Sequence, residues 1–287
     1  FDKLERFFMK TVAFHTLGCK VNTYETEAMQ QLMESAGYKC VEFTKRADVY
    51  IINTCSVTNI ADRKSRQMLH RARKMNEDAI VVAAGCYVES AKDKIDEDLS
   101  IDIIVGNNNK NDIVNIINEY LQDKIKNKFI IDINKETEYE EFNISKINDH
   151  TRAFIKVQDG CNQFCSYCII PFTRGRVRSR KMENIIDEVK NLSASGYKEI
   201  VLTGIHLSSY GVDFLDESYN KRMEKLTQTE ESDEEFVTKN ELLCLIENIA
   251  NIEGIERVRI GSLEPRIIQE NFIKSLSKID KFCPYFH

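Results

Sequence analysis

Three cysteines stand close together in the stretch GCNQFCSYCII, at Cys161, Cys165 and Cys168. Their C-x3-C-x2-C spacing offers three thiolates from one short loop, whereas a closed structural zinc site needs four ligands. A zinc knuckle completed by histidine is disfavoured, because the nearest histidines in the sequence are His150 and His206. A cubane [4Fe-4S] cluster has four irons, each usually held by one thiolate, so three thiolates leave one iron open to bind a substrate or cofactor. The spacing therefore favours an iron–sulfur cluster with one open iron.

A second group of three cysteines is dispersed along the chain, and each member follows an apolar segment. Cys19, Cys55 and Cys86 come directly after VAFHTLG, DVYIINT and AIVVAAG. Ligands bind at the C-terminal edge of open parallel sheets, so strands that end in cysteine are expected to bring these thiols to one rim. The alternative is three buried core thiols, since free cysteine packs like a small hydrophobic residue. The other cysteines have no such setting and are interpreted as ordinary thiols: Cys40, Cys244 and Cys283.

The segments that must position the dispersed cysteines alternate between strand and helix patterns over residues 10–122. Strands are predicted at 12–18, 48–54, 79–85 and 101–106, and helices at 22–35, 59–75 and 110–122. Asn22, with Glu25 three residues later, is expected to form a capping box at the start of the first helix, and Gly37 to end it. This alternation predicts an α/β fold with a parallel sheet and helices on its faces.

A second strand–helix series occupies residues 151–287. It follows the polar, charged segment 123–150, which we interpret as a linker with one strand near 129–133. Strands are predicted at 153–158, 199–204 and 257–262, helices at 182–195, 240–252 and 269–278, and a solvated acidic insertion at 212–239. These units suit part of a TIM-like β/α barrel, but three strands cannot close one, so the barrel is expected to be incomplete.

Length and composition limit the class of protein. The 287 residues are enough for one large or two medium domains, and the apolar fraction of 42% is ordinary for a globular protein. No apolar run approaches the roughly 20 residues of a membrane span, and the start FDKLERFFMK does not resemble a secretory signal. A cytoplasmic protein with reduced cysteines and no membrane contact is therefore expected. Residues 1–8, which precede Met9, are expected to be an upstream remnant.

Basic residues are clustered although the formal net charge is −6. One run lies at 63–74 and a second at 174–181, directly after the three-cysteine loop. Lysine and arginine that neutralise phosphates give nucleic-acid binding its dependence on salt, so both runs are candidates for RNA contact. For the first run, a solvated helix face is an equally good interpretation.

Longer motifs around these residues resemble the radical S-adenosylmethionine methylthiotransferase family. The stretch CNQFCSYC carries the aromatic residue that this superfamily has before its last cysteine, and other matching stretches follow in order between residue 11 and about 265: TLGCKVNTYETEAM, INTCSVTNIADRKSRQ, AAGCY, FIKVQDGCNQFCSYCIIPFTRGRVRSR, GYKEIVLTGIHLSSYG and RIGSLEP. They most resemble the branch that acts on N6-threonylcarbamoyladenosine at position 37 of tRNA. Sibling branches modify isopentenyl-adenosine tRNA or a ribosomal protein.

The resemblance implies a transferase with two [4Fe-4S] clusters and S-adenosyl-L-methionine as cofactors. Cys161, Cys165 and Cys168 would hold the cluster whose open iron binds S-adenosylmethionine. The dispersed trio of cysteines would hold an auxiliary cluster that carries or donates the sulfur. In the family, a 5′-deoxyadenosyl radical activates C2 of the adenine, and the product is the 2-methylthio nucleoside. The fold implied is an N-terminal methylthiotransferase domain followed by a radical SAM β/α barrel.

The resemblance also assigns binding residues and partners. By analogy with barrel sites at C-terminal strand ends, the S-adenosylmethionine pocket is expected to include Tyr167, Thr203, Gly204, Ser262 and Glu264. The anticodon stem-loop is expected to contact basic residues of both runs: Arg63, Lys64, Arg66, Arg174, Arg176 and Arg178. An electron donor of the flavodoxin or ferredoxin type is implied, and a monomer is expected.

One departure from the family pattern keeps a rival function open. The family chain continues past FCPYFH with the rest of the barrel and usually a C-terminal RNA-binding β-barrel domain, so this chain looks C-terminally truncated. The rival interpretation is an inactive fragment that acts only as an iron–sulfur electron carrier or as an RNA-binding module.

Overall fold

The computed structural model divides into two units, Phe1–Ile133 and Asn134–His287, and describes residues 10–91, 94–142, 152–214 and 240–287. The first unit contains a six-stranded sheet of order β2-β1-β3-β4-β5-β6, in which every pair of neighbours is parallel. Its strands are β1 Thr11–Thr16, β2 Lys39–Val41, β3 Val49–Thr54, β4 Ile80–Gly85, β5 Ile103–Val105 and β6 Asn127–Phe129. Its helices are α1 Lys20–Ser35, α2 Asn59–Met75, α3 Cys86–Ser90, η1 Ile95–Glu97, η2 Lys110–Asp112 and α4 Ile113–Asp123.

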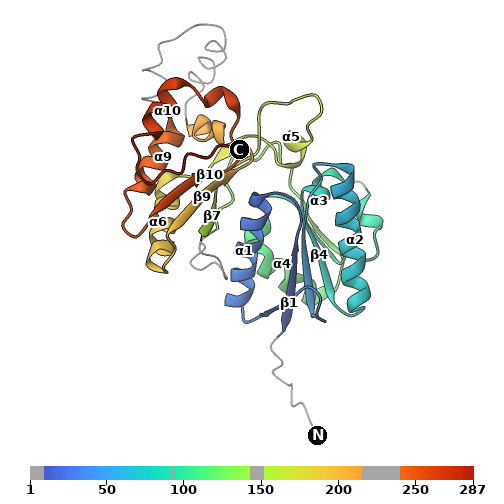
Figure 1. Cartoon of the computed structure of the whole chain (residues 1–287). Coiled ribbons are helices and arrows are strands. Elements are labelled where there is room, and N and C mark those ends of the chain that lie inside the picture. Colours follow the sequence, from blue (N-terminus) through green and yellow to red (C-terminus); the bar gives the residue numbers. More distant parts are fainter. Residues whose placement is uncertain (1–9, 92–93, 143–151, 215–239) are drawn as a thin grey trace. The chain divides into compact units, whose positions relative to one another are not determined.

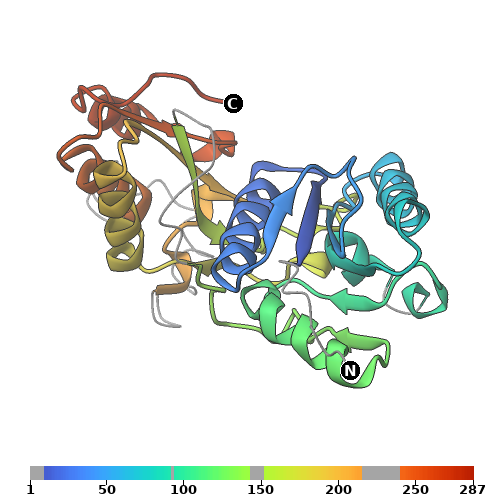
Figure 2. The ribbon, with the colours of Figure 1, turned by 90° about the horizontal axis from the view of Figure 1, so that it is seen from below.

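Helices cover both faces of this sheet (Figure 1), with α1 and α4 on one face and α2 and α3 on the other. Figure 2 shows α1 and α2 on opposite sides of β1 in the rotated view. Along β3, Tyr50 and Ile52 pack into the core on the α2 side, while Val49 and Ile51 pack into the core on the α1 side. Successive strand residues point to opposite faces, so a strand buried on both faces is apolar throughout. The prediction of an α/β fold with a parallel sheet is confirmed.

The first helix begins differently from the prediction. Cys19, not Asn22, is the N-cap of α1, and its side chain makes no capping hydrogen bond. The Nδ2 group of the buried Asn22 instead donates to the carbonyl oxygens of Leu17, at 2.7 Å, and Thr54, at 2.9 Å. The predicted capping box is therefore wrong, because Asn22 lies inside the helix and joins it to the end of β3.

Glu25, the second residue of the predicted capping box, also has a tertiary role. Its Oε2 accepts a bond from Nζ of Lys110 at 2.5 Å, and both side chains are buried. This ion pair joins α1 to the segment between β5 and α4. The predicted end of α1 is confirmed, since Ala36 is the C-cap and Gly37 has a φ of +87°.

The segment interpreted as a linker begins inside the first unit. Strand β6 pairs in parallel with β5, so the strand expected near 129–133 is found at Asn127–Phe129. Residues 143–150 of that segment lie outside the described residues, as do residues 215–239 of the acidic insertion. The described start of the insertion is the short helix η4, Val212–Phe214. The carboxylate of Asp213 there accepts a bond from the backbone N–H of Ser179 at 2.7 Å.

The second unit contains a four-stranded sheet of order β10-β9-β7-β8, in which β7, β9 and β10 are parallel and β8 is antiparallel to β7. Its strands are β7 Arg152–Asp159, β8 Arg178–Ser179, β9 Glu199–Gly204 and β10 Arg257–Ile260. The helices among its described residues are α5 Ile170–Thr173, α6 Met182–Ala194, η3 Leu207–Ser209, η4, α9 Glu241–Ala250, η5 Pro265–Ile267 and α10 Glu270–Leu276. The three predicted strands are confirmed, and this open sheet agrees with a partial barrel. Among the described helices, none combines the length and the apolar character needed to cross a membrane.

Glu199 links two strands of the second sheet and gives a prediction on stability. Burial opposes ionisation of Glu199, but hydrogen bonds from Arg257 and Arg259 at 2.9 and 2.8 Å outweigh it and lower its pKa below the ordinary 4.5. The stabilisation is therefore present above pH 4.5 and is lost as the pH falls through the lowered pKa. Glu199→Gln is expected to lower the unfolding free energy by about 1 kcal/mol at pH 7, and by much less at acid pH.

Chemical denaturation at both pH values measures this difference. Glu256→Gln is the matched control, since Glu256 is exposed and pairs only at the surface with Lys198 and Arg257. An equal loss at pH 7 and at acid pH would show that Glu199 acts through packing and not through its charge.

Candidate functional site

The dispersed cysteines lie at one edge of the first sheet. Strands β1, β3 and β4 are neighbours that run in the same direction, so their C-terminal ends lie together. Cys19 is the N-cap of α1, Cys55 directly follows β3, and Cys86 directly follows β4. Thr54 pairs with Gly85 in the strand register, so Cys55 and Cys86 continue from paired residues. Parallel pairing thus brings to one edge three thiols that are far apart in the sequence.

A glycine allows close approach of two of these cysteine loops. Gly18 has a φ of +96°, a conformation that residues with a Cβ rarely adopt. A Cβ at this position would lie 2.8 Å from both Cβ and Sγ of Cys55, so a side chain here would displace the thiol. Cys55 and Cys86 are buried, whereas Cys19 is exposed. The loop before Cys19 therefore packs directly against the thiol of Cys55.

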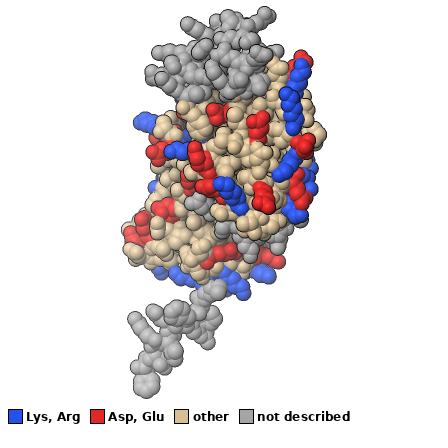
Figure 3. Space-filling view, turned by 90° about the vertical axis from the view of Figure 1, so that its left-hand side faces the viewer, with Lys and Arg blue, Asp and Glu red and all other residues tan. Residues whose placement is uncertain are grey.

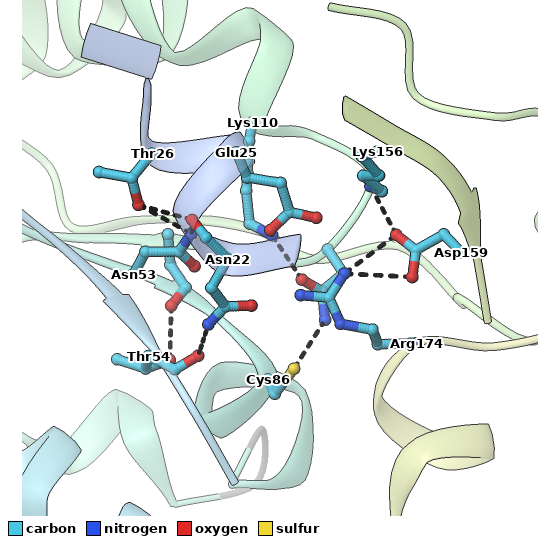
Figure 4. Close-up of polar contacts among 12 residues, drawn as sticks. Asn22, Glu25, Thr26, Asn53, Thr54, Cys86, Lys110, Lys156, Asp159 and Arg174 are labelled. Atoms are coloured by element: carbon cyan, nitrogen blue, oxygen red, sulfur yellow. Dashed lines mark hydrogen bonds and ion pairs between the residues drawn. The ribbon is translucent and has the colours of Figure 1, made fainter. Parts of the chain in front are cut away.

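A buried set of amide and hydroxyl groups fixes the backbone below these thiols (Figure 4). The two bonds donated by Asn22 hold the residues just before the Cys19 and Cys55 loops. Nδ2 of Asn53 donates to the carbonyl oxygen of Asn22 at 3.0 Å and to Oγ1 of Thr26 at 3.2 Å. Because Asn22 and Asn53 are buried, these bonds are made without competition from water.

The third cysteine of this edge has its own polar neighbour. Nδ2 of Asn107 lies 3.7 Å from Sγ of Cys86, in donor geometry for an N–H···S hydrogen bond. Oδ1 of Asn107 accepts a bond from Nζ of Lys110 at 2.6 Å, and its backbone N–H donates to Glu89 at 2.8 Å. Sequence reasoning missed Asn107. The signal was present, because Asn107 follows the predicted strand 101–106 just as each cysteine follows its own strand.

The dispersed trio offers a donor set that suits an iron–sulfur cluster. Among the described residues, no group of three or more His, Cys, Asp and Glu side chains is arranged to hold one ion. A cubane has an iron at each of four corners, so its ligands need not converge on one point. The donors gathered at this edge are thiols, which iron–sulfur clusters select. The chemistry of the donors and their common edge therefore fit a three-thiolate cluster.

The clustered cysteines lie on the loop between β7 and α5 in the second unit. Gly160 starts the loop with a φ of +70°, and a Cβ there would lie 1.8 Å from the carbonyl oxygen of Arg176. The backbone N–H of Cys161 donates to the carbonyl oxygen of Gly175 at 3.1 Å. These contacts attach the start of the loop to the segment that follows α5.

The three thiols of this loop are close enough to affect one another. Burial raises the pKa of Cys161, and the negative charges that Cys168 and Cys165 would carry raise it further. A hydrogen bond from the backbone of Gln163 opposes both effects. Three thiolates held this close need positive charge among them, and the irons of a cluster would supply it. The loop therefore fits a cluster held by three thiolates.

A buried carboxylate supports the start of the loop (Figure 4). Asp159, the last residue of β7, accepts bonds from the backbone N–H of Gly160 at 2.8 Å and from Nζ of Lys156 at 2.6 Å. Nη1 of Arg174 contacts both of its oxygens, at 3.1 and 3.0 Å. Nη1 of Arg178 donates to the carbonyl oxygens of Arg174 and Arg176, each at 3.0 Å.

These contacts correct one expectation about RNA. Arg174 and Arg178 were expected to face the anticodon stem-loop, but both side chains are buried and support the loop. The charge pattern did not reveal this, because a buried carboxylate upstream, Asp159, recruits the guanidinium of Arg174. Arg176 differs, since it is exposed and its guanidinium lies 4.3 Å from the ring centre of Phe164.

The expected S-adenosylmethionine pocket residues lie along one edge of the second sheet. Since β7, β9 and β10 are parallel, Thr203 and Gly204 end β9 at the same edge as the cysteine loop, and Ser262 and Glu264 follow β10 there. Thr203 is buried and Ser262 is exposed. Tyr167 is 91% exposed, so its ring is available for a ligand.

Gln158 is a supporting residue that sequence reasoning missed. Its Nε2 donates to the carbonyl oxygens of Asp159 and Gly160, each at 2.7 Å, and its Oε1 accepts from the backbone N–H of His206 at 2.7 Å. It therefore joins the cysteine loop to the turn after β9. A polar residue within an otherwise buried strand was the available signal.

The first basic run lies on α2, which begins four residues after Cys55. Arg63, Lys64 and Arg66 are exposed in the first half of this helix, and the guanidinium of Arg66 lies 5.7 Å from the ring centre of Tyr87. Because α2 follows the C-terminal end of β3, its first half lies toward the edge that carries the dispersed cysteines. On the face shown in Figure 3, acidic and basic side chains are intermixed over the described residues.

Comparison with known families and proteins agrees with this organisation. Residues 11–106 match the family described as "Uncharacterized protein family UPF0004", and residues 155–227 match the radical SAM superfamily. The chain is 40% identical over 279 residues to the threonylcarbamoyladenosine tRNA methylthiotransferase MtaB of Bacillus subtilis (strain 168), covering 97% of this chain and 57% of that protein. It is 37% identical to MtaB of Aquifex aeolicus (strain VF5), covering 96% of this chain and 62% of that protein.

A second group of relatives carries a different name. The tRNA-2-methylthio-N(6)-dimethylallyladenosine synthase of Thermoanaerobacter sp. (strain X514) is 34% identical over 293 residues, covering 97% of this chain and 56% of that protein. The chain thus spans little more than half the length of these relatives. The resemblance to the methylthiotransferase family that the motifs indicated is confirmed.

Solved structures support the fold. The radical S-adenosylmethionine methyltransferase TsrM from Kitasatospora setae, solved with cobalamin and a [4Fe-4S] cluster, has a TM-score of 0.54 and 13% sequence identity. The match covers 95% of this chain and 68% of that chain. A second structure of that protein, with tryptophan and a SAM analogue, has a TM-score of 0.52.

Gly18 gives a test of the first cysteine site. Gly18→Ala is expected to displace the thiol of Cys55 and to reduce the iron bound at this edge, because the new Cβ would overlap that side chain. Gly37→Ala is the matched control, since Gly37 also has a positive φ but would place its Cβ in open space. Both variants should lose about 1 kcal/mol of stability from backbone strain.

The prediction is checked by measuring the iron content and the visible absorbance of the two variants after anaerobic reconstitution. Both variants are made in a chain that has alanine in place of Cys161, Cys165 and Cys168. Equal iron in Gly18→Ala and Gly37→Ala would contradict the placement of Cys55 as a ligand.

Proposed function

We propose that this chain contains the cluster-binding part of a tRNA methylthiotransferase. It joins a UPF0004 region to a radical SAM region, as expected for the tRNA methylthiotransferases that it resembles. The reaction we propose is transfer of a methylthio group to C2 of N6-threonylcarbamoyladenosine at position 37 of tRNA. The observation that carries the proposal is the presence of two trios of thiols, each at the C-terminal ends of parallel strands. The similarity to the MtaB proteins supports the choice of nucleoside.

The cofactors in this proposal are two [4Fe-4S] clusters and S-adenosylmethionine. Bound clusters with an open iron would supply the coordination site, the electron and the radical chemistry that protein side chains lack. Cys161, Cys165 and Cys168 would hold the cluster that binds S-adenosylmethionine. The auxiliary cluster would be held by the other trio: Cys19, Cys55 and Cys86.

The chain's own residues would hold and orient these groups. Asp159 and Gln158 fix the start of the clustered-cysteine loop through buried hydrogen bonds. Tyr167 is proposed to lie near the adenine of S-adenosylmethionine, within a pocket formed by strand-end residues: Thr203, Gly204, Ser262 and Glu264. Precise support of this kind matters because a small displacement of reacting groups can cost a large part of the rate.

The partner in this proposal is the anticodon stem-loop of a tRNA. Arg63, Lys64, Arg66 and Arg176 are exposed and are proposed to contact its phosphates. The target adenine would be splayed out of the loop, as bases of single-stranded loops are when proteins recognise them. An electron donor of the flavodoxin or ferredoxin type, a monomeric state and a cytoplasmic location complete the proposal.

A second candidate is methylthiolation of isopentenyl-adenosine tRNA. It is supported by the relatives named dimethylallyladenosine synthases, at 34% and 31% identity. The sibling activity on a ribosomal protein is a third outcome of the same experiment. The rival of another class is a fragment that only binds an iron–sulfur cluster or RNA.

One experiment separates these functions. The reconstituted chain is incubated anaerobically with S-adenosylmethionine, sulfide, a strong reductant and, in turn, three substrates: stem-loop RNA with threonylcarbamoyladenosine, stem-loop RNA with isopentenyl-adenosine, and the ribosomal peptide. We expect a methylthio mass gain on the first RNA alone. Gain on another substrate would overturn the chosen branch, and iron loading without release of 5′-deoxyadenosine would support the non-catalytic fragment.

The basic residues of α2 give a separate prediction. Replacement of Arg63, Lys64 and Arg66 by alanine should reduce the slope of log affinity against log salt by about two, because three phosphate contacts are lost. Filter binding of the stem-loop RNA over a series of salt concentrations measures this slope. Arg71→Ala/Lys74→Ala, at the other end of the same helix, is the control. An unchanged slope in the triple variant would show that this helix face is only solvated.

A further inference from the structure

We propose that Asn107 is a positioning residue of the auxiliary cluster. Its side chain donates an N–H···S hydrogen bond to Cys86 and is oriented by the buried Glu25–Lys110 ion pair. This inference rests on the proposed function for the presence of a cluster at Cys86. It goes beyond that function because it assigns the tuning of the cluster's reduction potential to a neutral side chain. No sequence motif singled out this side chain.

The geometry around Asn107 leaves its side chain little freedom. Asn107 is fully buried, and both ends of its amide face a partner: Nδ2 faces Sγ of Cys86 at 3.7 Å, and Oδ1 accepts from Lys110 at 2.6 Å. An ammonium group can only donate, so Lys110 requires the oxygen of the amide on its side. The N–H group must then point toward Cys86. The lysine therefore determines which way the amide is turned.

Lys110 is in turn fixed by Glu25 from helix α1. Both side chains are buried, and Nζ of Lys110 lies 2.5 Å from Oε2 of Glu25. A buried ion pair contributes little to stability on balance, because desolvation of the two charges offsets their attraction. The role of this ion pair is orientation. Glu25 holds Lys110 in place, and Lys110 in turn orients the amide of Asn107. The chain of contacts runs from Glu25 through Lys110 and Asn107 to Cys86. Figure 4 labels Glu25, Lys110 and Cys86 of this chain.

The hydrogen bond predicts a property that a purely structural residue would not change. Hydrogen bonds to the sulfurs are among the factors that set the reduction potential of an iron–sulfur cluster. Reduction adds negative charge, which an N–H donor to sulfur stabilises. Removal of the donor should therefore shift the potential to a more negative value. Loss of such an outer contact also typically weakens metal binding by about ten- to a hundred-fold.

The experiment uses the full chain with Cys161, Cys165 and Cys168 replaced by alanine, so that only the auxiliary site can hold a cluster. Asn107→Leu removes the donor and keeps the branching and the number of heavy atoms of the side chain. Asn109→Leu is the matched control, because Asn109 lies on the same loop and donates to the carbonyl oxygen of Phe129, and not to a cysteine. The readouts are iron retained against a chelator and the midpoint potential from a redox titration followed by electron paramagnetic resonance.

We expect Asn107→Leu to shift the potential to a more negative value and to lose iron about ten- to a hundred-fold more readily, with Asn109→Leu unchanged. The double variant Glu25→Leu/Lys110→Met provides a second route if Asn107→Leu does not fold, because paired apolar replacement of a buried ion pair is well tolerated. It should shift the potential in the same direction while it leaves the circular dichroism spectrum unchanged.

The outcomes separate this inference from the proposed function. An unchanged potential and unchanged iron retention in a folded Asn107→Leu or double variant would overturn the inference alone. If replacement of Cys19, Cys55 and Cys86 in the same chain leaves the bound iron unchanged, the auxiliary cluster itself is wrong and the inference is overturned with it.

Discussion

Parallel pairing of β1, β3 and β4 is the constraint on which the first site depends. Strands that run in the same direction end at the same edge, so cysteines separated by more than thirty residues from one another become neighbours without any local motif. The second unit obeys the same rule, because β7, β9 and β10 end together at the edge that carries the clustered cysteines. Each unit thus presents thiols at the edge where ligands of α/β proteins bind.

Edge placement alone does not fix a thiol, and buried polar contacts supply the remaining order. In the first unit, Asn22 joins the residues before Cys19 and Cys55, and Asn107 reaches Cys86. In the second unit, Asp159 and Gln158 bind the start of the loop that carries Cys161. Buried polar groups are costly when unpaired, so such networks specify one arrangement more than they add stability. Both sites therefore combine a hydrogen-bonded buried base with thiols of unequal exposure. Cys19 and Cys165 are exposed, whereas Cys55, Cys86 and Cys161 are buried.

The sequence predicted the elements well because the core strands are apolar on both faces. DVYIINT and AIVVAAG could be recognised as buried strands, and the cysteine after each gave the edge position. Patterns based on sequence spacing gave wrong predictions where a side chain bonds to a residue distant in the sequence. Asn22 and Glu25 match a capping box by spacing, yet they bind β3 and Lys110 instead. A rule based on neighbours in the chain cannot anticipate a partner 85 residues away.

The arginines after the clustered cysteines illustrate the same limit. Alternating Arg174, Arg176 and Arg178 suggested one basic surface, but burial divides them, and Arg176 alone of the three is exposed. The spacing of charged residues does not tell which of them meet a buried carboxylate. Burial raises the pKa of Cys40 to about 12, so this thiol stays protonated at neutral pH.

If each trio of thiols holds one cubane, iron and sulfide analysis of three matched chains will show it. The unaltered chain is compared, after anaerobic reconstitution, with one that has alanine at Cys19, Cys55 and Cys86 and one that has alanine at Cys161, Cys165 and Cys168. Two cubanes per chain correspond to about eight irons in the unaltered chain and about four in each variant. About four irons in the unaltered chain, or no loss in either variant, would contradict the presence of one cubane at each trio of thiols.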